Sequence, residues 1–326
     1  MLHQFTKNLP TASDVHIDGP LTNMSLGFMQ SENAFVATKV FPMLPVAKQS
    51  DKYFTYDRSY WYRNEMKLRA PSTESAGAGF AISTDDYFCD VYALHKDIDD
   101  DMRGNADSPI QVDRDASGFL SLQALLNLEK TWTTNFFTTS KWTTDKTPTT
   151  TWDDPSSDPV GDVQTGVTTI TQSTGVDPSS IDMTIGYLTW EKLVHHPDLV
   201  DRIKYGQTSG PAQVTLEAMA AVFGVGRVLV ARAVENTADE GATASYSFIS
   251  GKHALLSSSP ASTGLRTPSS GYTIVWTGRV GANQAGAVIR RIRADLLKSD
   301  RYEIEQAFVQ KLVSADLGYF FNGAVA

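Results

Sequence analysis

Two aromatic segments joined by a small, polar linker constrain the fold of this chain most strongly. Aromatic side chains alternate along residues 52–63 (KYFTYDRSYWYR), and apolar residues alternate in the same way along residues 80–94. Alternation predicts two strands, because every second residue of a strand lies on the same face. The residues predicted to share one face of the first strand are Phe54, Tyr56, Tyr60 and Tyr62.

The linker between these strands, residues 64–79, reads NEMKLRAPSTESAGAG, and its Gly, Pro and small polar residues are typical of an exposed tip. The sequence therefore predicts a long two-stranded ribbon. Because an isolated two-stranded ribbon is only marginally stable in water, we expect this one to lie against a partner surface.

The strongest helical pattern follows the ribbon. Apolar residues recur at steps of three and four between Phe119 and Phe136, which predicts a helix over about 112–138. Asp113 and Asp115 lie near its start, where negative charge is favourable. The threonine-rich stretch that follows, residues 131–151, favours extended chain after the helix.

The first fifty residues predict an arm, because scattered Pro and Gly interrupt every period there. Phe35, Val36, Val40 and Phe41 are nonetheless too apolar to remain in solvent, and we expect them to pack against the body of the chain or against a neighbour. Since no intrachain cover for the arm or the ribbon is evident, we expect both to be mobile in a free subunit.

From residue 181 onward short strands and short helices alternate, which predicts a compact α/β or α+β lobe. Before it, Asp162 is predicted to cap a short helix. The predicted strands are 181–186, 228–233, 246–250 and 272–276, and the predicted helices are 190–195, 198–205 and 214–223. Two more strands are predicted after the lobe, at 288–296 and 302–312.

Composition excludes several classes of protein. With 37 acidic and 28 basic residues, the net charge of −9 argues against a protein that coats nucleic acid. One cysteine, Cys89, excludes an intrachain disulfide framework and an all-cysteine metal site. The N-terminal segment does not have the pattern of a signal peptide, and no apolar run is long enough to cross a bilayer, so we expect a protein that folds in a reducing cytosol.

The polar clusters predict no catalytic, cofactor or metal residues. His195-His196-Pro197 lacks the glutamate of a zinc-protease helix, and the acidic turn at 97–107 lacks the Gly and Glu of an EF-hand. Cys89 is interpreted as a buried structural thiol. Arginines form one basic concentration, interpreted mainly as a source of subunit salt bridges and secondarily as a contact for nucleic acid or for a neighbour's acidic loop. It comprises Arg279, Arg290, Arg291 and Arg293.

Four stretches, in this order, resemble the major capsid proteins of tailed bacteriophages, which have the Hong Kong 97-type fold. Residues 105–117 (NADSPIQVDRDAS) are similar to the lead-in to that family's spine helix, and Trp142…Trp152-Asp153…Ser157-Asp158-Pro159 is similar to the stretch after it. Residues 193–206 (LVHHPDLVDRIKYG) are similar to its axial lobe. Residues 299–325 (SDRYEIEQAFVQKLVSADLGYFFNGAV) are similar to its C-terminal strands.

The resemblance implies an α+β shell subunit in five parts. These are an N-terminal arm (1–48), an extended ribbon loop (49–95), a peripheral domain with the spine helix (96–180), an inserted axial domain (181–286) and returning peripheral strands (287–326). Such subunits assemble as hexamers and pentamers into an icosahedral shell around double-stranded DNA, without a cofactor. The expected location is the virion capsid, assembled in the host bacterial cytoplasm.

The resemblance also implies partners. A portal is expected, and a decoration protein could replace the lysine–asparagine cross-link that some relatives form. Lys67 lies near the ribbon tip, but no acid–asparagine pair for a cross-link can be identified. Since the sequence begins almost directly with the arm, a separate scaffolding protein is expected. Contact with DNA is expected to be weak and non-specific, because a negatively charged wall repels phosphate.

Contacts with a neighbouring subunit are predicted at the ribbon tip, through Trp61, Arg63, Lys67 and Arg69. Two alternatives remain open. An encapsulin-like compartment shell shares the fold but encloses an enzyme instead of a genome. A soluble hydrolase would need a pocket in the 181–286 lobe that brings His195 and Asp198 to a hydroxyl nucleophile.

Overall fold

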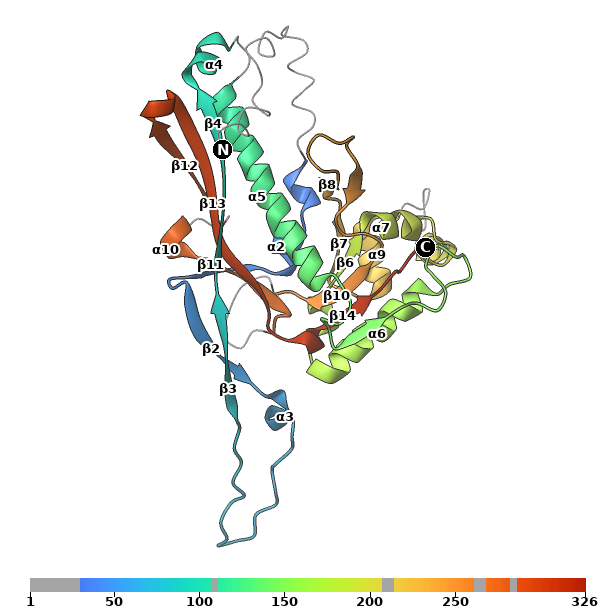
Figure 1. Ribbon diagram of the computed structural model, residues 1–326. Helices are drawn as coiled ribbons and strands as arrows, with labels where there is room; N and C mark the ends of the chain where they lie inside the picture. The colour runs from blue at the N-terminus through green and yellow to red at the C-terminus, as the bar shows by residue number, and fades with distance from the viewer. Residues whose placement is uncertain (1–29, 107–110, 207–213, 261–267, 282–285) are drawn as a thin grey trace.

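A computed structural model of the chain describes residues 30–106, 111–206, 214–260, 268–281 and 286–326. It is an α+β structure with two five-stranded sheets, one long helix and a projecting ribbon (Figure 1). The helices are η3 Glu32–Ala34, α2 Ala37–Val40, α3 Arg58–Trp61, α4 Asp100–Asn105, α5 Val112–Phe136, α6 Pro159–Thr174, η4 Pro178–Ser180, α7 Tyr187–Val194, α8 Pro197–Gly206, α9 Leu216–Phe223, α10 Thr277–Val280, η5 Asp295–Leu297 and η6 Ala315–Leu317. The strands are β1 Met43–Val46, β2 Ser50–Tyr56, β3 Ile82–Phe88, β4 Asp90–Asp99, β5 Thr144–Lys146, β6 Ile181–Gly186, β7 Arg227–Ala231, β8 Val234–Asn236, β9 Tyr246–Phe248, β10 Ala254–Ser258, β11 Gly271–Trp276, β12 Ala287–Ala294, β13 Ser299–Leu312 and β14 Gly318–Phe321.

The first sheet is organised around β13. This strand pairs antiparallel with β4, β11 and β12, and β1 joins the sheet in parallel with β11. Tyr302, Ile304 and Phe308, which were predicted to share a face, are all buried, and Glu305 and Ala307 on the other face are buried as well. Gln306 and Gln310 lie on the same face as Tyr302 and donate hydrogen bonds to carbonyls of α5, at 3.2 and 3.1 Å, so this face is the one that α5 covers.

The long helix is confirmed, and it ends at Phe136, two residues before the predicted end. Its buried residues recur every four positions, as expected of a helix that packs on one side. They include Leu120, Ala124, Leu128, Trp132 and Phe136. In Figure 1 the helix runs between the first sheet and the lobe that contains the second, so α5 joins the two cores of the molecule.

The second sheet has the order β5-β14-β10-β6-β7, and α6, α7, α8 and α9 pack beside it. Helix α6 and strands β5 and β14 lie outside the predicted axial domain (181–286), yet they share the core of this lobe. Strand β11 lies inside that range but belongs to the first sheet. The two sheets therefore do not follow the predicted boundaries at 180 and 286. The chain crosses between sheets several times, and alternation along a strand does not say which sheet the strand joins.

Several local predictions need correction. The first ribbon strand ends at Tyr56 because the Asp57 side chain accepts a hydrogen bond from the Ser59 N–H, at 2.9 Å, and starts the short helix α3. Tyr60 and Tyr62 therefore do not continue a strand face. Helix α6 is capped by Asp158 rather than Asp162, which lies in its first turn.

Part of the predicted arm packs against the body of the chain, which was one of the two expected alternatives. Val36, Val40 and Phe41 are buried in the same core as Trp132 and Phe136, Phe35 is buried as well, and β1 is a strand of the first sheet. Residues 35–46 thus have intrachain cover, which the sequence did not reveal because their partners are about ninety residues or more away. The predicted arm residues 1–29 lie outside the described residues.

Candidate subunit interface

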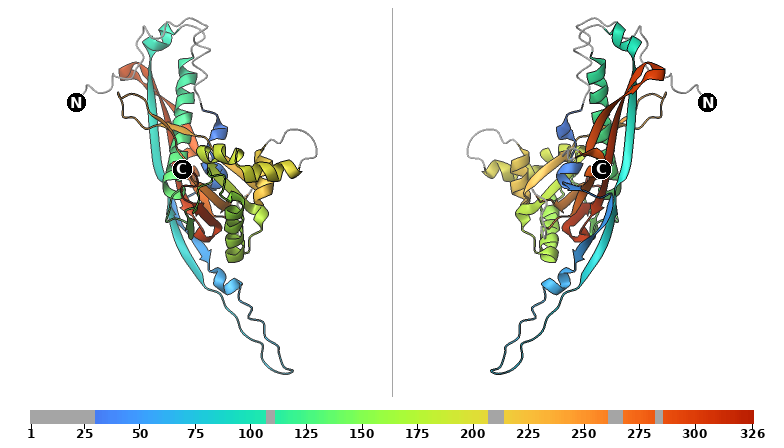
Figure 2. Two further views of the ribbon diagram at one scale, coloured as in Figure 1. Left: turned by 90° about the vertical axis from the view of Figure 1, so that its right-hand side faces the viewer. Right: turned by 90° about the vertical axis from the view of Figure 1, so that its left-hand side faces the viewer.

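The ribbon is the candidate interface, and its geometry begins with β2 and β3. These strands pair antiparallel from Ser50 opposite Phe88 to Tyr56 opposite Ile82, and they form a separate two-stranded sheet. Beyond them, residues 62–81 have no regular secondary structure. Figures 1 and 2 show the ribbon projecting away from both five-stranded sheets, so neither sheet covers its outer part.

At its base the ribbon is fixed to the first sheet through Cys89. The Cys89 side chain is fully buried, its N–H donates to the Gln49 carbonyl at 2.9 Å, and its thiol contacts the Ile274 carbonyl at 3.7 Å. Burial raises the pKa of the Cys89 thiol to about 11. The prediction of a buried structural thiol is confirmed, because a thiol with so high a pKa is a poor nucleophile.

Two contacts hold the ribbon further along its length. Arg58 of α3 forms an ion pair with Asp316 at 2.8 Å, and the Tyr62 hydroxyl donates to the Thr174 carbonyl at the end of α6. Gly175, which follows, has a φ of 68° and leaves room for the Tyr62 ring. The ribbon is therefore positioned as far as Tyr62, and residues 63–81 extend beyond this support.

Exposed apolar side chains concentrate on the ribbon. Of the twenty large hydrophobic residues that are exposed in the described part of the chain, ten lie on the ribbon, between Phe54 and Phe88. Tyr56, Trp61 and Phe80 form one cluster, with Trp61 and Phe80 ring centroids 5.3 Å apart, and they are 41%, 50% and 55% exposed. An apolar cluster held open to solvent in this way is typical of a protein-binding surface.

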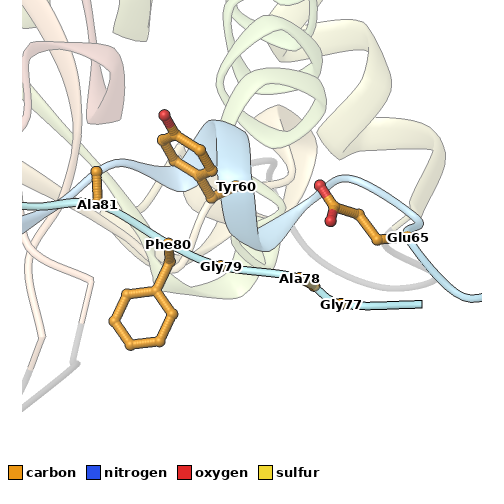
Figure 3. A pocket seen from close by; sticks show the side chains of 7 residues that line it. All are labelled: Tyr60, Glu65, Gly77, Ala78, Gly79, Phe80 and Ala81. Atoms are coloured by element: carbon orange, nitrogen blue, oxygen red, sulfur yellow. The ribbon is translucent and has the colours of Figure 1, made fainter. Parts of the chain in front are cut away.

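A shallow open crevice lies between the outgoing and returning segments of the ribbon, next to this cluster (Figure 3). Its volume is about 570 Å³. The crevice is lined by Tyr60, Glu65, Gly77, Ala78, Gly79, Phe80 and Ala81. The lining is mostly small residues with one carboxylate, and it offers no group of catalytic residues.

All four residues predicted to contact a neighbour are exposed on the outer ribbon. Trp61 belongs to the aromatic cluster, Arg63 lies 3.4 Å from Glu65, and the Arg69 side chain donates to the Thr73 carbonyl at 2.6 Å. Lys67 is exposed near the tip. Sequence reasoning did not single out Phe80 and Tyr56 for this cluster, although their alternation placed both on strands.

The arginine concentration, which was interpreted mainly as a source of subunit salt bridges, forms ion pairs within the chain. Arg279 and Arg290 both pair with the buried Glu305, at 2.5 and 2.6 Å. Arg291 and Arg293 reach Asp300, at 2.5 and 3.5 Å. The register places Arg290 and Arg291 opposite consecutive residues of β13.

The ion pairs of Asp300 lie at the base of the turn that joins β12 to β13. Arg103 also pairs with Asp300 at 2.8 Å, and the hydrogen bonds from arginines lower the pKa of Asp300 to about 2. Between β12 and β13, Leu296 is fully exposed and Leu297 is 64% exposed. This turn is a second surface on which apolar side chains face solvent from a fixed backbone.

The acidic residues of the predicted turn also form ion pairs within the chain. Asp97 pairs with Arg301 at 2.8 Å, and Asp100 pairs with Arg293 at 2.6 Å. No cluster of His, Cys, Asp or Glu suited to a metal ion occurs among the residues that the structure describes. No described helix is long and apolar enough to cross a membrane.

The hydrolase alternative depends on a base next to a hydroxyl, and the geometry opposes it. His195 is exposed and Asp198 pairs with Arg202 at 2.9 Å, so these residues do not form the expected pocket. The buried neighbour His196 has Ser157 Oγ 3.2 Å from its Nε2. However, His196 Nδ1 accepts the Asp198 N–H, which leaves the ring proton on Nε2. Ser157 donates its proton to the Asp154 carbonyl at 2.8 Å, so His196 cannot accept it as a base.

Comparisons with known proteins agree with this geometry. No protein-family profile matches the chain. The major capsid protein of Burkholderia phage BcepMu is 25% identical over an alignment that covers 94% of this chain and 96% of the relative. A phage-related protein from Bordetella bronchiseptica has a similar structure, with a TM-score of 0.67 and 21% identity over 94% of this chain and 97% of that one.

More distant structures share the fold. The capsid of cyanophage P-SCSP1u superposes with a TM-score of 0.60 at 10% identity, covering 86% of each chain. The SrpI encapsulin of Synechococcus elongatus gives a TM-score of 0.54 at 10% identity, over 90% of this chain and 88% of that one. Both likenesses concern the fold alone.

The chain therefore has the Hong Kong 97-type capsid fold, which is shared by virion shells and encapsulins. Within that class, its predicted resemblance to the major capsid proteins of tailed phages is confirmed. The 25%-identical relative is a major capsid protein, which is a structural protein, and this agrees with the prediction that the chain is not an enzyme.

Proposed function

We propose that this chain is a shell subunit that assembles into hexamers and pentamers around packaged double-stranded DNA. The observation that carries the proposal is the projecting ribbon, whose base is fixed by buried contacts while its aromatic cluster faces solvent. The ribbon lies over a neighbouring subunit, with Trp61, Arg63, Lys67 and Arg69 among the contacts.

The energetics favour such a contact. A half-exposed aromatic ring that becomes covered removes roughly 100 Å² from water, which is worth about 2.5 kcal/mol at about 25 cal/mol per Å². Trp61, Phe80 and the 69%-exposed Phe54 could each contribute on this scale. A few buried aromatic residues commonly supply most of the free energy of a protein interface.

Each sheet takes a different place in the proposed shell. The lobe built on the second sheet, which includes most of residues 181–286, surrounds the centre of a capsomer. The first sheet and α5 lie toward the junctions between capsomers, where the exposed Leu296 and Leu297 meet other copies.

The proposed partners and location follow from this role. A separate scaffolding protein, a portal and possible decoration subunits are expected during assembly in the host bacterial cytoplasm. The net charge of −9 keeps contact between the wall and the packaged DNA weak and non-specific. An encapsulin-like shell is the second candidate, because encapsulins share the fold. The 25% sequence identity to a phage major capsid protein favours the virion role over the encapsulin role.

The test is assembly of the full-length protein with and without the aromatic contact. Trp61→Ala should reduce the yield of shells or capsomers at least tenfold, since a hot-spot side chain is typically worth about 2 kcal/mol or more. Tyr246→Ala is a matched control, because Tyr246 is a 76%-exposed aromatic residue outside the ribbon. Assembly is measured by sedimentation and electron microscopy. Equal yields for the natural chain, Trp61→Ala and Tyr246→Ala would show that the aromatic cluster of the ribbon is not part of the interface. Nuclease-resistant DNA inside particles from infected cells would distinguish a virion from an enzyme compartment.

A further inference from the structure

A buried carboxylate lies where the end of the arm meets the long helix. Glu129 of α5 is fully buried, and its Oε2 accepts the N–H groups of Val36 and Ala37, at 2.9 and 2.8 Å. Its second oxygen, Oε1, is buried without a hydrogen-bond partner in the described part of the chain. When Glu129 is ionised, hydrogen-bond donors stabilise only Oε2, and Oε1 carries its part of the negative charge without a donor in the described part of the chain.

The segment that Glu129 holds, residues 30–41, has further contacts with the body. Phe41 packs edge-on against Trp132, and the Val40 carbonyl accepts a hydrogen bond from the Ser259 hydroxyl at 2.6 Å. The Arg232 N–H donates to the Ala34 carbonyl at 3.1 Å. These contacts are independent of protonation, so they keep the segment in place whichever form Glu129 takes, and the carboxyl adjusts how tightly it is held.

Burial disfavours the charged form of Glu129. It raises the pKa of this carboxyl from 4.5 to about 7, although the two N–H donors and the Lys39 charge oppose the rise. Other charged groups on the surrounding elements are already engaged. Lys130 pairs with Glu235 of β8 at 2.5 Å, and Arg227 of β7 pairs with Asp182 at 2.8 Å. Beside β10, burial lowers the pKa of His253, which favours its neutral form.

We propose that Glu129 is a proton-linked latch for residues 30–41. When protonated, the carboxyl lies in the apolar contact at little cost; when ionised, it favours any opening of the segment that brings water to it. The docked state binds more protons than the open state between the two pKa values, so docking weakens as pH rises through this window. The latch is a conformational device beyond the proposed shell role, because it acts within one subunit.

The test is hydrogen exchange of the full-length protein at the amides of Val36 and Ala37. A docked pKa of about 7 and an open value of 4.5 predict that their protection falls about tenfold between about pH 6 and pH 8. Protection is corrected for the intrinsic effect of pH on exchange and compared with amides of β10. Glu129→Gln keeps an acceptor oxygen but cannot ionise, and its protection should not depend on pH. Glu235→Gln, the matched control, should behave as the natural chain does.

A flat profile in the natural chain, or an unchanged pH dependence in Glu129→Gln, would overturn the latch. If Glu129→Gln does not fold, infrared spectroscopy of the natural protein decides the question. The protonated-carboxyl band should be present near pH 6, where exposed carboxyls are ionised, and absent near pH 8. Absence of the band at both pH values contradicts the proposal. Neither measurement depends on assembly, so failure of the latch would leave the shell role intact.

Discussion

Cys89 gives a prediction at the scale of single residues, because it connects the ribbon to the first sheet. Its thiol is fully buried with a pKa of about 11, so thiol reagents should modify it only after unfolding. We expect labelling of the native protein at pH 8 to be at least tenfold slower than labelling in denaturant. Rapid modification of the native protein, followed by mass spectrometry, would show that the ribbon base opens readily.

Glu305 gives a second prediction at this scale. It is 3% exposed and accepts hydrogen bonds from both Arg279 and Arg290. Glu305→Gln should lower the free energy of unfolding by about 1–3 kcal/mol, because two guanidinium groups lose their anionic partner. The half-buried Glu303, on the same strand, is the control, and Glu303→Gln should cost less than about 1 kcal/mol. Equal losses of unfolding free energy for the two variants, measured by urea denaturation, would mean that the buried ion pairs of Glu305 stabilise the chain no more than a half-buried glutamate does.

At the scale of elements, α5 shows that adjacent residues of one helix can differ widely in solvent exposure. Leu120 is fully buried against the first sheet, whereas Phe119 is 45% exposed. Leu120→Ala should destabilise the chain by about 2–5 kcal/mol, because a core cavity is created. Phe119→Ala should cost about 1 kcal/mol or less. Thermal and urea unfolding check the difference, and a reversed order would mean that another face of the helix is packed.

The ribbon gives the second prediction at this scale. Arg63, Lys67 and Arg69 are exposed in a segment without regular structure, which is a favourable substrate for trypsin. Limited digestion of the free subunit should cleave there before it cleaves in the sheets, and assembled particles should be protected by at least tenfold. Equal cleavage rates in subunits and particles would indicate that the ribbon tip stays uncovered after assembly.

The sequence predicted most elements because their patterns are local. The apolar steps of α5 follow from burial on one side, which leaves a periodic trace in the sequence. The short strands β10 and β14 were missed, because both are buried on all sides and have no alternation to detect. Within the candidate interface, Trp61 was predicted, whereas its cluster with Phe80 depends on how the outgoing and returning segments of the ribbon meet.

At the scale of the whole molecule, the division into parts was harder to predict than the parts themselves. Strand β14 follows β13 closely in the chain but joins the other sheet, and residues 35–46 pack into a core formed mainly by distant segments. Such crossings depend on long-range contacts that no local pattern records. The family resemblance predicted the architecture, and the structure shows how the two sheets share the chain.

The central claim is that this chain exists to associate with copies of itself, and the mass of the purified full-length protein tests it most directly. Light scattering with negative-stain microscopy should show rings, tubes or closed shells far larger than the 35.6 kDa subunit. A 35.6 kDa monomer that stays monodisperse at every salt and protein concentration, and also when candidate scaffolding proteins are added, would contradict self-assembly.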